Sequence, residues 1–440
     1  MNLNKKTISV VIDYEINFCA LELIMHKLLN NGYSLNVYCS YSLINTVSNS
    51  FTGDRIHIVP LDPLRKQTHW AYVMHRVLRG LVTNPKFSCS SWYQYSNMCN
   101  SSSAVKRCLY YTLNKLPKLK GNTVNQFLMC LMPLFIRSVF RTQKVLVAAR
   151  TLVPELLCAR GLKVFSVIES WDHPGKYPVG FTSVNVFAWN RDIGEDWIRY
   201  QGGDTFTVSY PMKHRYVIEH LRDHLPVSVT PLKGAPFILY AFASNGQTSN
   251  KRLFQEELSF IGEICEAALA HQRTVFIKPK AQGNTRDFDF LLDRYPNVVI
   301  GSYKDSGDRP EDYYLDADYN ALRLKELQQC DLMVNGGTTF GIDAALFGLP
   351  VLQLDFCDAN QYPATSQAFT NYHLKKYFVS DPNLTISIRG STTVFAALNE
   401  YLSNPDGREA RYGDRLRNWI HTDEPIGEAM DRVFKVIHNS

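Results

Sequence analysis

The chain has 440 residues, of which 45% are apolar and 20% are charged, and its net charge is +6 at neutral pH. A chain of this size and composition has material for two cores, so we expect two domains of about 200 residues each. No low-complexity tract and no uninterrupted apolar run of about 18 residues is present, which excludes a disordered chain and predicts no membrane-spanning helix. The first residues lead directly into an expected strand, so no signal peptide is predicted.

The positive charge is concentrated in one stretch. Between positions 63 and 154 there are fourteen Lys and Arg residues and no Asp or Glu, so the rest of the chain is net acidic. Such a stretch indicates an anionic partner, for example an anionic membrane, a lipid diphosphate or an acidic polysaccharide. No nucleic-acid recognition motif accompanies it, so nucleic acid is not an expected partner.

The ten cysteines include no Cys-x-x-Cys pair. Several fall in apolar segments, which predicts buried free thiols in a reducing cytoplasm. A structural zinc site is therefore not expected, and no metal site is predicted.

The first half of the chain follows a strand and helix alternation. A strand at 7–13, a helix at 18–30 and strands at 35–39 and 55–60 predict a parallel, doubly wound sheet. The pattern resumes after the basic stretch, with strands at 144–148, 163–169, 184–189 and 205–209 and helices at 153–160 and 193–200.

The basic stretch interrupts this alternation as an insert at 63–143. A polar loop at 88–103 is followed by apolar and basic segments at 105–120 and 125–141, which are expected to be helical, with Pro133 breaking the second. Two interpretations remain open. The insert is either a basic amphipathic surface that lies on a membrane or an ordinary helical insert packed on the sheet.

The second half repeats the plan of the first. The segment 226–236 contains three prolines and a glycine and is expected to be a linker. The following strands are predicted at 237–242, 274–278 and 298–301, with helices at 253–271 and 320–330. We therefore expect two Rossmann-like domains, 1–225 and 236–440.

The most informative stretch is 331–356, which has the pattern of strand, glycine turn, helix, tight turn and strand. Gly336 and Gly337 end the first strand, and Thr338 is placed to cap a helix at 340–347. A glycine turn at the start of a helix exposes backbone N–H groups that favour an anion, most often a phosphate. The alternative is an ordinary strand-to-helix turn without a ligand.

This stretch resembles the donor-site segment of GT-B glycosyltransferases, which commonly has the pattern small-Ser/Thr-Thr-x-Gly-x-Glu-Ala-x-x-x-Gly-x-Pro-Val. The matching residues are Thr338, Thr339, Gly341, Ala344, Gly348, Pro350 and Val351. The acidic position holds Asp343 in place of the usual glutamate, one methylene shorter. The resemblance implies that Thr338 and Thr339 contact donor phosphate and that Asp343 holds a donor hydroxyl with altered reach.

Lys278 and Lys280 follow the expected strand at 274–278. The position is similar to the Lys/Arg-Pro-His motif near the donor phosphates of GT-B transferases of surface-polysaccharide pathways. The resemblance implies that both lysines offset leaving-group charge without a metal ion. The alternative is a solvated lysine pair at a strand end. Ser244, in the polar turn after 237–242, is a further expected phosphate contact.

A third signal, Glu169-Ser170-Trp171-Asp172-His173, follows another strand. It resembles a group of polysaccharide-assembly transferases related to the glycerophosphate and Kdo transferases. An inverting transferase needs a base for the acceptor hydroxyl, and Asp172 is the first candidate, followed by Glu169 and His173. Glu15 or Asp13, at the carboxyl end of the first strand, is an alternative base, or either residue caps the following helix. His173 could instead fix its loop by a hydrogen bond.

Together these features predict the GT-B fold, with helices at 407–419 and 426–438 packing across the seam between two facing domains. The expected activity is transfer of a sugar from a nucleotide-sugar donor to a surface polysaccharide or lipid-linked glycan, with no cofactor. The expected location is the cytoplasm, with peripheral contact at the inner membrane face through 63–154. The alternatives are a nucleotide-sugar epimerase or hydrolase of the same fold, and a non-catalytic protein that binds glycan or membrane.

Overall fold

A computed structural model of the chain contains two compact units, Met1–Lys213 with Asp423–Ser440 and His214–Thr422. The basic insert at 63–143 lies almost wholly outside the described residues. The structure describes residues 6–13, 15–61, 104–105, 108, 112, 142–148, 162–168, 184–201, 205–222, 236–242, 251–279, 288–301, 317–336, 338–356, 361–363, 365, 385–388, 392–404, 415–420 and 424–440.

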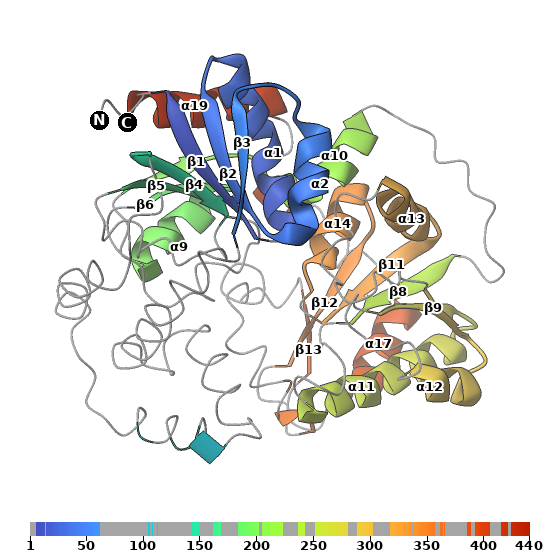
Figure 1. The fold of residues 1–440 in the computed structure, drawn as a ribbon. Helices are drawn as coiled ribbons and strands as arrows, with labels where there is room; N and C mark the ends of the chain where they lie inside the picture. Colours follow the sequence, from blue (N-terminus) through green and yellow to red (C-terminus); the bar gives the residue numbers. More distant parts are fainter. Residues whose placement is uncertain are drawn as a thin grey trace. The chain divides into compact units, whose positions relative to one another are not determined.

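The first unit contains a seven-stranded sheet in the order β3-β2-β1-β4-β5-β6-β7, with every neighbouring pair parallel. The strand order reverses between β1 and β4, as in a doubly wound sheet (Figure 1). The strands are β1 (Thr7–Ile12), β2 (Ser34–Cys39), β3 (Ile56–Pro60), β4 (Lys144–Ala148), β5 (Lys163–Val167), β6 (Val184–Ala188) and β7 (Phe206–Val208). The main helices are α1 (Glu15–Asn30), α2 (Ile44–Ser50), α9 (Arg191–Gln201) and α19 (Ile426–Asn439).

The sequence of these strands explains why the sheet is parallel. Val145, Leu146 and Val147 of β4 are fully buried, as are Ile8, Val10 and other successive residues of β1. Strands that are covered by helices on both faces are apolar at successive positions, not at alternate ones.

Helix α19 returns the end of the chain to the first unit and packs beside α1. The Nζ atom of Lys144, at the start of β4, donates to the backbone oxygens of Ile437 (2.7 Å) and His438 (3.3 Å). Lys163 donates to the backbone oxygen of Ser440, and the Tyr33 hydroxyl lies 2.9 Å from Nδ1 of His438. Two basic side chains therefore cap the carboxyl end of this helix, where the helix dipole is negative.

The second unit contains a six-stranded parallel sheet in the order β10-β9-β8-β11-β12-β13. Its order reverses between β8 and β11. The strands are β8 (Phe237–Ala241), β9 (Thr274–Lys278), β10 (Val298–Ile300), β11 (Cys330–Asn335), β12 (Val351–Asp355) and β13 (Thr385–Ser387). The helices are α10 (Arg215–Arg222), α11 (Lys251–Ala270), α12 (Asp289–Arg294), α13 (Ala317–Gln328), α14 (Phe340–Phe347) and α17 (Val394–Ser403).

The core of the second unit lies between its sheet and helices α11, α12 and α17. Alternate strand residues such as Ile238, Tyr240, Val275 and Ile277 face this layer. Helices α13 and α14 lie on the other side of the sheet (Figure 1). The intervening strand residues, which include Phe276 and Lys278, therefore face α13 and α14.

The predicted fold class is confirmed. Both sheets are parallel and doubly wound, and the chain has the two-domain α/β architecture of the GT-B class. The chain passes between the units at Lys213 and His214, ahead of the segment expected as the linker, and α10 packs with α14 of the second unit. Strand β13 and helix α17 were not among the predicted elements. Among the described residues, no helix is both long enough and apolar enough to cross a membrane.

Replacing Lys144 by Met should lower the free energy of unfolding by about 1 kcal/mol, because the last carbonyl groups of α19 lose a charged donor. Urea denaturation of the full chain measures this loss. Lys27→Met is the matched control, because it removes an ion pair with Asp431 of the same helix that is partly exposed. The control should cost less than about 0.5 kcal/mol. A loss in Lys27→Met equal to that in Lys144→Met would contradict the proposed capping.

Candidate functional site

The turn between β11 and α14 is organised by the side chain of Asn335, the last residue of β11. Its Oδ1 accepts hydrogen bonds from the backbone N–H of Thr338 (2.9 Å) and from the Thr338 hydroxyl (3.1 Å). Its Nδ2 donates to Gln353 Oε1 on β12 at 3.0 Å. Asn335 is 1% exposed, so the turn is fixed from inside the unit.

This arrangement corrects one expectation about the helix. Helix α14 has the predicted bounds, but its N-cap residue is Thr339 and not Thr338. Thr338 is bonded to Asn335 and therefore belongs to the turn. Gly348 ends the helix with a φ of 96°, the left-handed conformation that favours glycine at this place.

Two glycines of the turn are required by close packing. A Cβ on Gly336 would lie 2.8 Å from the Tyr240 hydroxyl, and a Cβ on Gly341 would lie 2.5 Å from Asn335 Nδ2. Both distances are too short for a side chain. Part of the glycine pattern is thus explained by packing of buried polar groups, independently of any ligand.

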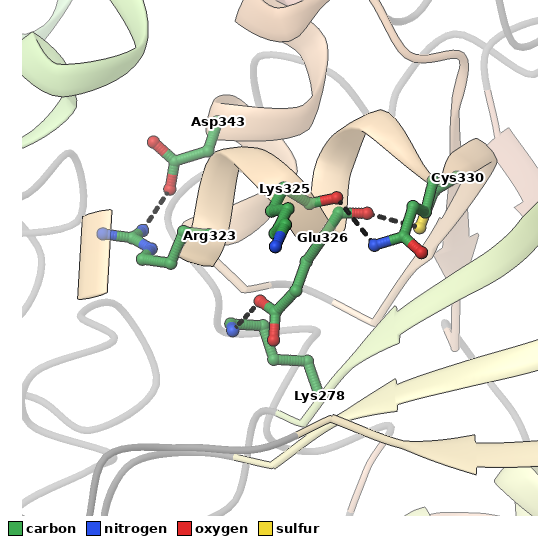
Figure 2. Close-up of polar contacts among 7 residues, drawn as sticks. Lys278, Arg323, Lys325, Glu326, Cys330 and Asp343 are labelled. Atoms are coloured by element: carbon green, nitrogen blue, oxygen red, sulfur yellow. Dashed lines mark hydrogen bonds and ion pairs between the residues drawn. The ribbon is translucent and has the colours of Figure 1, made fainter. Parts of the chain in front are cut away.

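Asp343 lies in the first turn of α14 and is 1% exposed. One of its carboxylate oxygens is 2.6 Å from Nδ1 of His214, and the other accepts a hydrogen bond from Arg323 Nη2 at 2.7 Å. Figure 2 shows the Arg323 side chain directed at Asp343 from α13. The expected contact between Asp343 and a donor hydroxyl needs an accessible carboxylate oxygen, and this geometry does not provide one.

Aromatic rings surround the Arg323 guanidinium. Its central carbon lies 4.3 Å from the ring centre of Tyr216, 5.3 Å from that of Phe340 and 5.9 Å from that of Tyr319. Cation–π attraction stabilises a desolvated guanidinium in this position. Burial raises the pKa of Tyr216 well above its ordinary value, an effect that Arg323 opposes and Asp343 reinforces.

Lys278, the last residue of β9, forms a buried ion pair with Glu326 of α13 (Figure 2). The two side chains are 7% and 4% exposed. Burial raises the pKa of Glu326, while the Lys278 ammonium acts in the opposite direction. The Lys278 ammonium also lies 5.4 Å from the Phe340 ring centre, so both buried cations lie beside Phe340.

This pairing changes the role expected for Lys278. Its charge is balanced within the protein by Glu326, so it is not a surplus cation for leaving-group phosphate, nor is it solvated. If the Lys278 ammonium left Glu326 to bind a ligand, Glu326 would stay buried without its counter-charge, which costs several kcal/mol.

The structure brings together Lys278, Gly336, Thr338, Thr339 and Asp343 at the carboxyl edge of the second sheet. Thr338 and Thr339 are half-buried. Glu15 begins α1 in the first unit. The remaining predicted site residues lie outside the described residues: Glu169, Asp172, His173, Ser244, Lys280 and Gly337.

Buried charge is concentrated at this edge. Lys278 and Asp355 are the last residues of strands β9 and β12, and Asp343 lies in the first turn of the helix that follows β11. Glu257 accepts a hydrogen bond from Tyr240, the residue packed under Gly336. Among the described residues of the second unit, the buried Asp, Glu, Lys and Arg residues are Glu257, Lys278, Arg323, Glu326, Asp343 and Asp355.

Sequence reasoning missed Asn335, His214, Arg323 and Glu326. The sequence did contain one signal for His214 and Arg323, because their partner Asp343 falls within the apolar helix FGIDAALF. A carboxylate in such a helix requires buried cationic or hydrogen-bonding partners. Its partners lie 129 and 20 residues away, at distances in the sequence that no local pattern encodes.

Within the described part of the chain, no group of three His, Cys, Asp or Glu residues is arranged to hold a metal ion. The described cysteines only partly follow the expectation of buried thiols. Cys39, Cys265 and Cys330 are buried, whereas Cys108 is exposed. Burial raises the pKa of Cys265 to about 12, so this thiol is unreactive in the folded protein.

No family model matches the sequence, and no curated protein matches it. Solved structures resemble the chain over nearly its whole length. They include the calicheamicin glycosyltransferase CalG4 (11% identity, 99% of this chain and 98% of that chain, TM-score 0.48) and MurG of Acinetobacter baumannii (11%, 99% and 100%, TM-score 0.42). A third is the UDP-GlcNAc 2-epimerase of Methanocaldococcus jannaschii in complex with UDP-GlcNAc and UDP (11%, 99% and 100%, TM-score 0.48). At these identities and TM-scores, the similarities assign no activity to this chain.

Replacing Lys278 by Met should lower the free energy of unfolding by about 3 kcal/mol, because Glu326 is left buried without a partner. Lys278→Met combined with Glu326→Leu should recover at least half of the loss. Loss of its partner raises the Glu326 pKa further, and an acid with a raised folded-state pKa favours folding at low pH. The deficit of Lys278→Met should therefore shrink as the pH falls from about 7.5 to about 5.

Urea denaturation at each pH measures these differences. Arg273→Met is the matched control, because its ion pair with Asp331 in the same unit is 28% and 44% exposed. Removing that pair should cost less than about 1 kcal/mol. A double variant no more stable than Lys278→Met alone would show that the two side chains do not act as a pair.

Proposed function

We propose that the chain is a glycosyltransferase that takes its sugar from a nucleotide-sugar donor and binds the donor phosphates at the turn between β11 and α14. The observation that carries the proposal is the place of this turn. It follows the strand beside the point where the strand order reverses, at the carboxyl edge of a parallel sheet. Ligands of doubly wound α/β sheets bind at this point.

The chemistry of the turn supports an anionic ligand. The start of α14 contributes backbone N–H groups and the positive end of the helix dipole. Half-buried Thr338 and Thr339 add hydroxyl groups beside them. The concentration of buried charge at this edge is a further indication, because such groups gather at functional sites.

The structure changes how the phosphates would be held. Lys278 and Arg323 are neutralised by Glu326 and Asp343, so neither contributes a spare positive charge. In the proposal, backbone N–H groups and the Thr339 hydroxyl bind the phosphates, and Lys280 supplies the cation for the leaving group. Catalysis without a metal ion remains part of the proposal.

The acceptor side of the proposal rests on the sequence. Asp172 is proposed as the base that deprotonates the acceptor hydroxyl, with Glu169, His173 and Glu15 as alternatives. The basic stretch at 63–154 is proposed to contact an anionic or lipid-linked glycan, or the anionic membrane surface that carries it. The corresponding products are surface polysaccharides such as capsule or lipopolysaccharide.

Nucleotide binding is the first test. One of UDP, CDP, CMP, GDP and dTDP should raise the melting temperature of the purified chain, and a chelator should not abolish the shift. A ligand that binds only the folded state stabilises it by mass action. If none of the five nucleotides shifts the melting temperature at about 0.1 mM, which is about 100 times a Kd of 1 μM, the donor site is contradicted. Loss or isomerisation of the sugar without an acceptor would contradict transfer.

Thr339→Val should weaken binding of the same nucleotide at least about tenfold, because one phosphate contact worth about 1.4 kcal/mol is lost. Isothermal titration calorimetry measures the Kd. Thr393→Val is the matched control in the same unit, because Thr393 caps α17 by accepting a hydrogen bond from the Ala396 N–H. This variant should lose about 1 kcal/mol of stability and retain the Kd. An equal loss of affinity in both variants would contradict a direct contact.

Asp172→Asn should lower the rate of sugar transfer by about a hundredfold or more and leave the nucleotide Kd unchanged, because a general base acts only in the chemical step. Glu169→Gln, His173→Gln and Glu15→Gln provide the comparison. Transfer by Asp172→Asn at the wild-type rate would exclude Asp172 as the base. A large loss in one of the other three would identify the residue that takes its place.

A further inference from the structure

A buried contact joins the start of the second unit to the helix of the proposed donor turn. His214 is the first residue of that unit and ends the short 3-10 helix η2 (Met212–His214). Its Nδ1 lies 2.6 Å from Asp343 Oδ1, and the side chains are 0% and 1% exposed. Helix α10 follows directly and packs against α14.

The same cluster holds two residues of the first turn of α14. Asp343 is bonded to His214 and Arg323, and Phe340 lies beside the Arg323 guanidinium. Residues three apart lie on the same face of a helix. One face of the first turn therefore contacts both His214 and Arg323 of α13.

We propose that His214 and Arg323 are positioning residues for the donor turn, that they act through Asp343, and that Asp343 itself does not contact the nucleotide. This inference rests on the proposed donor site. It gives the acidic position a role different from the hydroxyl contact that the sequence resemblance implies.

The cost of the alternative supports this assignment. Asp343 is 1% exposed, so its carboxylate would have to move out of the interior, away from His214 and Arg323, to accept a hydrogen bond from a ribose or sugar hydroxyl. Arg323 is 6% exposed, so its charge would be left in the interior without its partner. Removing one partner of a buried ion pair costs more than one hydroxyl contact returns.

The positioning role has a consequence for specificity. A residue that binds a ribose hydroxyl affects ribonucleotides and spares their deoxy analogues. A residue that positions the turn affects both alike, because both present the same diphosphate to the same N–H groups. The ratio of the affinities for UDP and 2′-deoxy-UDP therefore separates the positioning role from a contact with the ribose 2′-hydroxyl.

The test compares the wild type with Asp343→Asn, His214→Ala and His214→Asn, using UDP and 2′-deoxy-UDP as probes in calorimetric titrations. Asp343→Asn and His214→Ala should weaken both probes about tenfold, because small displacements of binding groups are costly, and the ratio of the two Kd values should not change. His214→Asn should restore both affinities to within about threefold, since the asparagine Nδ2 occupies the place of the histidine Nδ1. Collapse of the ratio to one in Asp343→Asn alone would show a direct hydroxyl contact and overturn the proposal.

Asn297→Ala provides the control for lost stability. Asn297 Nδ2 donates to the backbone oxygens of Cys265 and Arg273, both at 3.0 Å, at the amino edge of the same sheet. Its removal breaks buried hydrogen bonds in the same unit but away from the turn. This variant should lose stability and keep both affinities. If Asn297→Ala loses affinity to a similar extent, the effect of His214→Ala is explained by general destabilisation, and the positioning role is contradicted.

Amide hydrogen exchange of peptides that cover 338–342 gives a readout without ligand. His214→Ala and Asp343→Asn should each speed exchange in the first turn of α14, and Asn297→Ala should not. Unchanged exchange in both variants overturns the positioning role, whether or not UDP binds. Failure of the wild type to bind either probe overturns the donor site for this nucleotide, and the exchange data still decide the positioning role. If His214→Ala does not fold, Asp343→Asn and His214→Asn carry the same comparison.

Discussion

The arrangement of the second unit depends on the burial of one carboxylate. Asp343 sits in an otherwise apolar helix with 1% of its surface exposed. An unpaired carboxylate in that position would cost several kcal/mol, so folding must bring cationic or hydrogen-bonding partners to it. Those partners come from the start of the unit and from α13, on the amino-terminal side of the helix in sequence. The contacts of Asp343 thereby hold the start of the unit, α13 and α14 in one geometry.

The same constraint determines what the turn offers to a ligand. Each buried cation beside it already has an acidic partner, since Arg323 is paired with Asp343 and Lys278 with Glu326. In the proposed donor site, an anion would therefore be attracted by the start of α14 and by hydroxyl groups, not by excess positive charge. Interactions with backbone N–H groups depend strongly on direction. The affinity of the turn should consequently follow from how firmly Asn335 and the Asp343 cluster hold it.

The sequence was sufficient for the parallel sheets and for the bounds of α14, because apolar strands and a positive-φ glycine are local signals. It was not sufficient for the cap of that helix. Thr338 has the side chain of a capping residue, but its N–H and hydroxyl are bonded to Asn335. The N-cap position is occupied by Thr339, whose side chain makes no capping hydrogen bond. The partners of Lys278 and Asp343 were also out of reach, because Glu326 and His214 lie 48 and 129 residues away. The position of Asp343 in an apolar helix indicated that a partner was needed, but the sequence did not indicate which residue it was.

The two edges of the second sheet solve the burial of polar groups in different ways. At the amino edge, Asn297 makes neutral hydrogen bonds, and the Arg273–Asp331 pair is partly exposed. At the carboxyl edge, Lys278 and Arg323 are buried as ion pairs with Glu326 and Asp343, an arrangement that apolar residues of similar volume often match or exceed in stability. Stability alone therefore does not explain why charge is buried at one edge. The proposed positioning role gives a reason, because paired charges would hold the start of α14 in one orientation at the edge where ligands of doubly wound sheets bind.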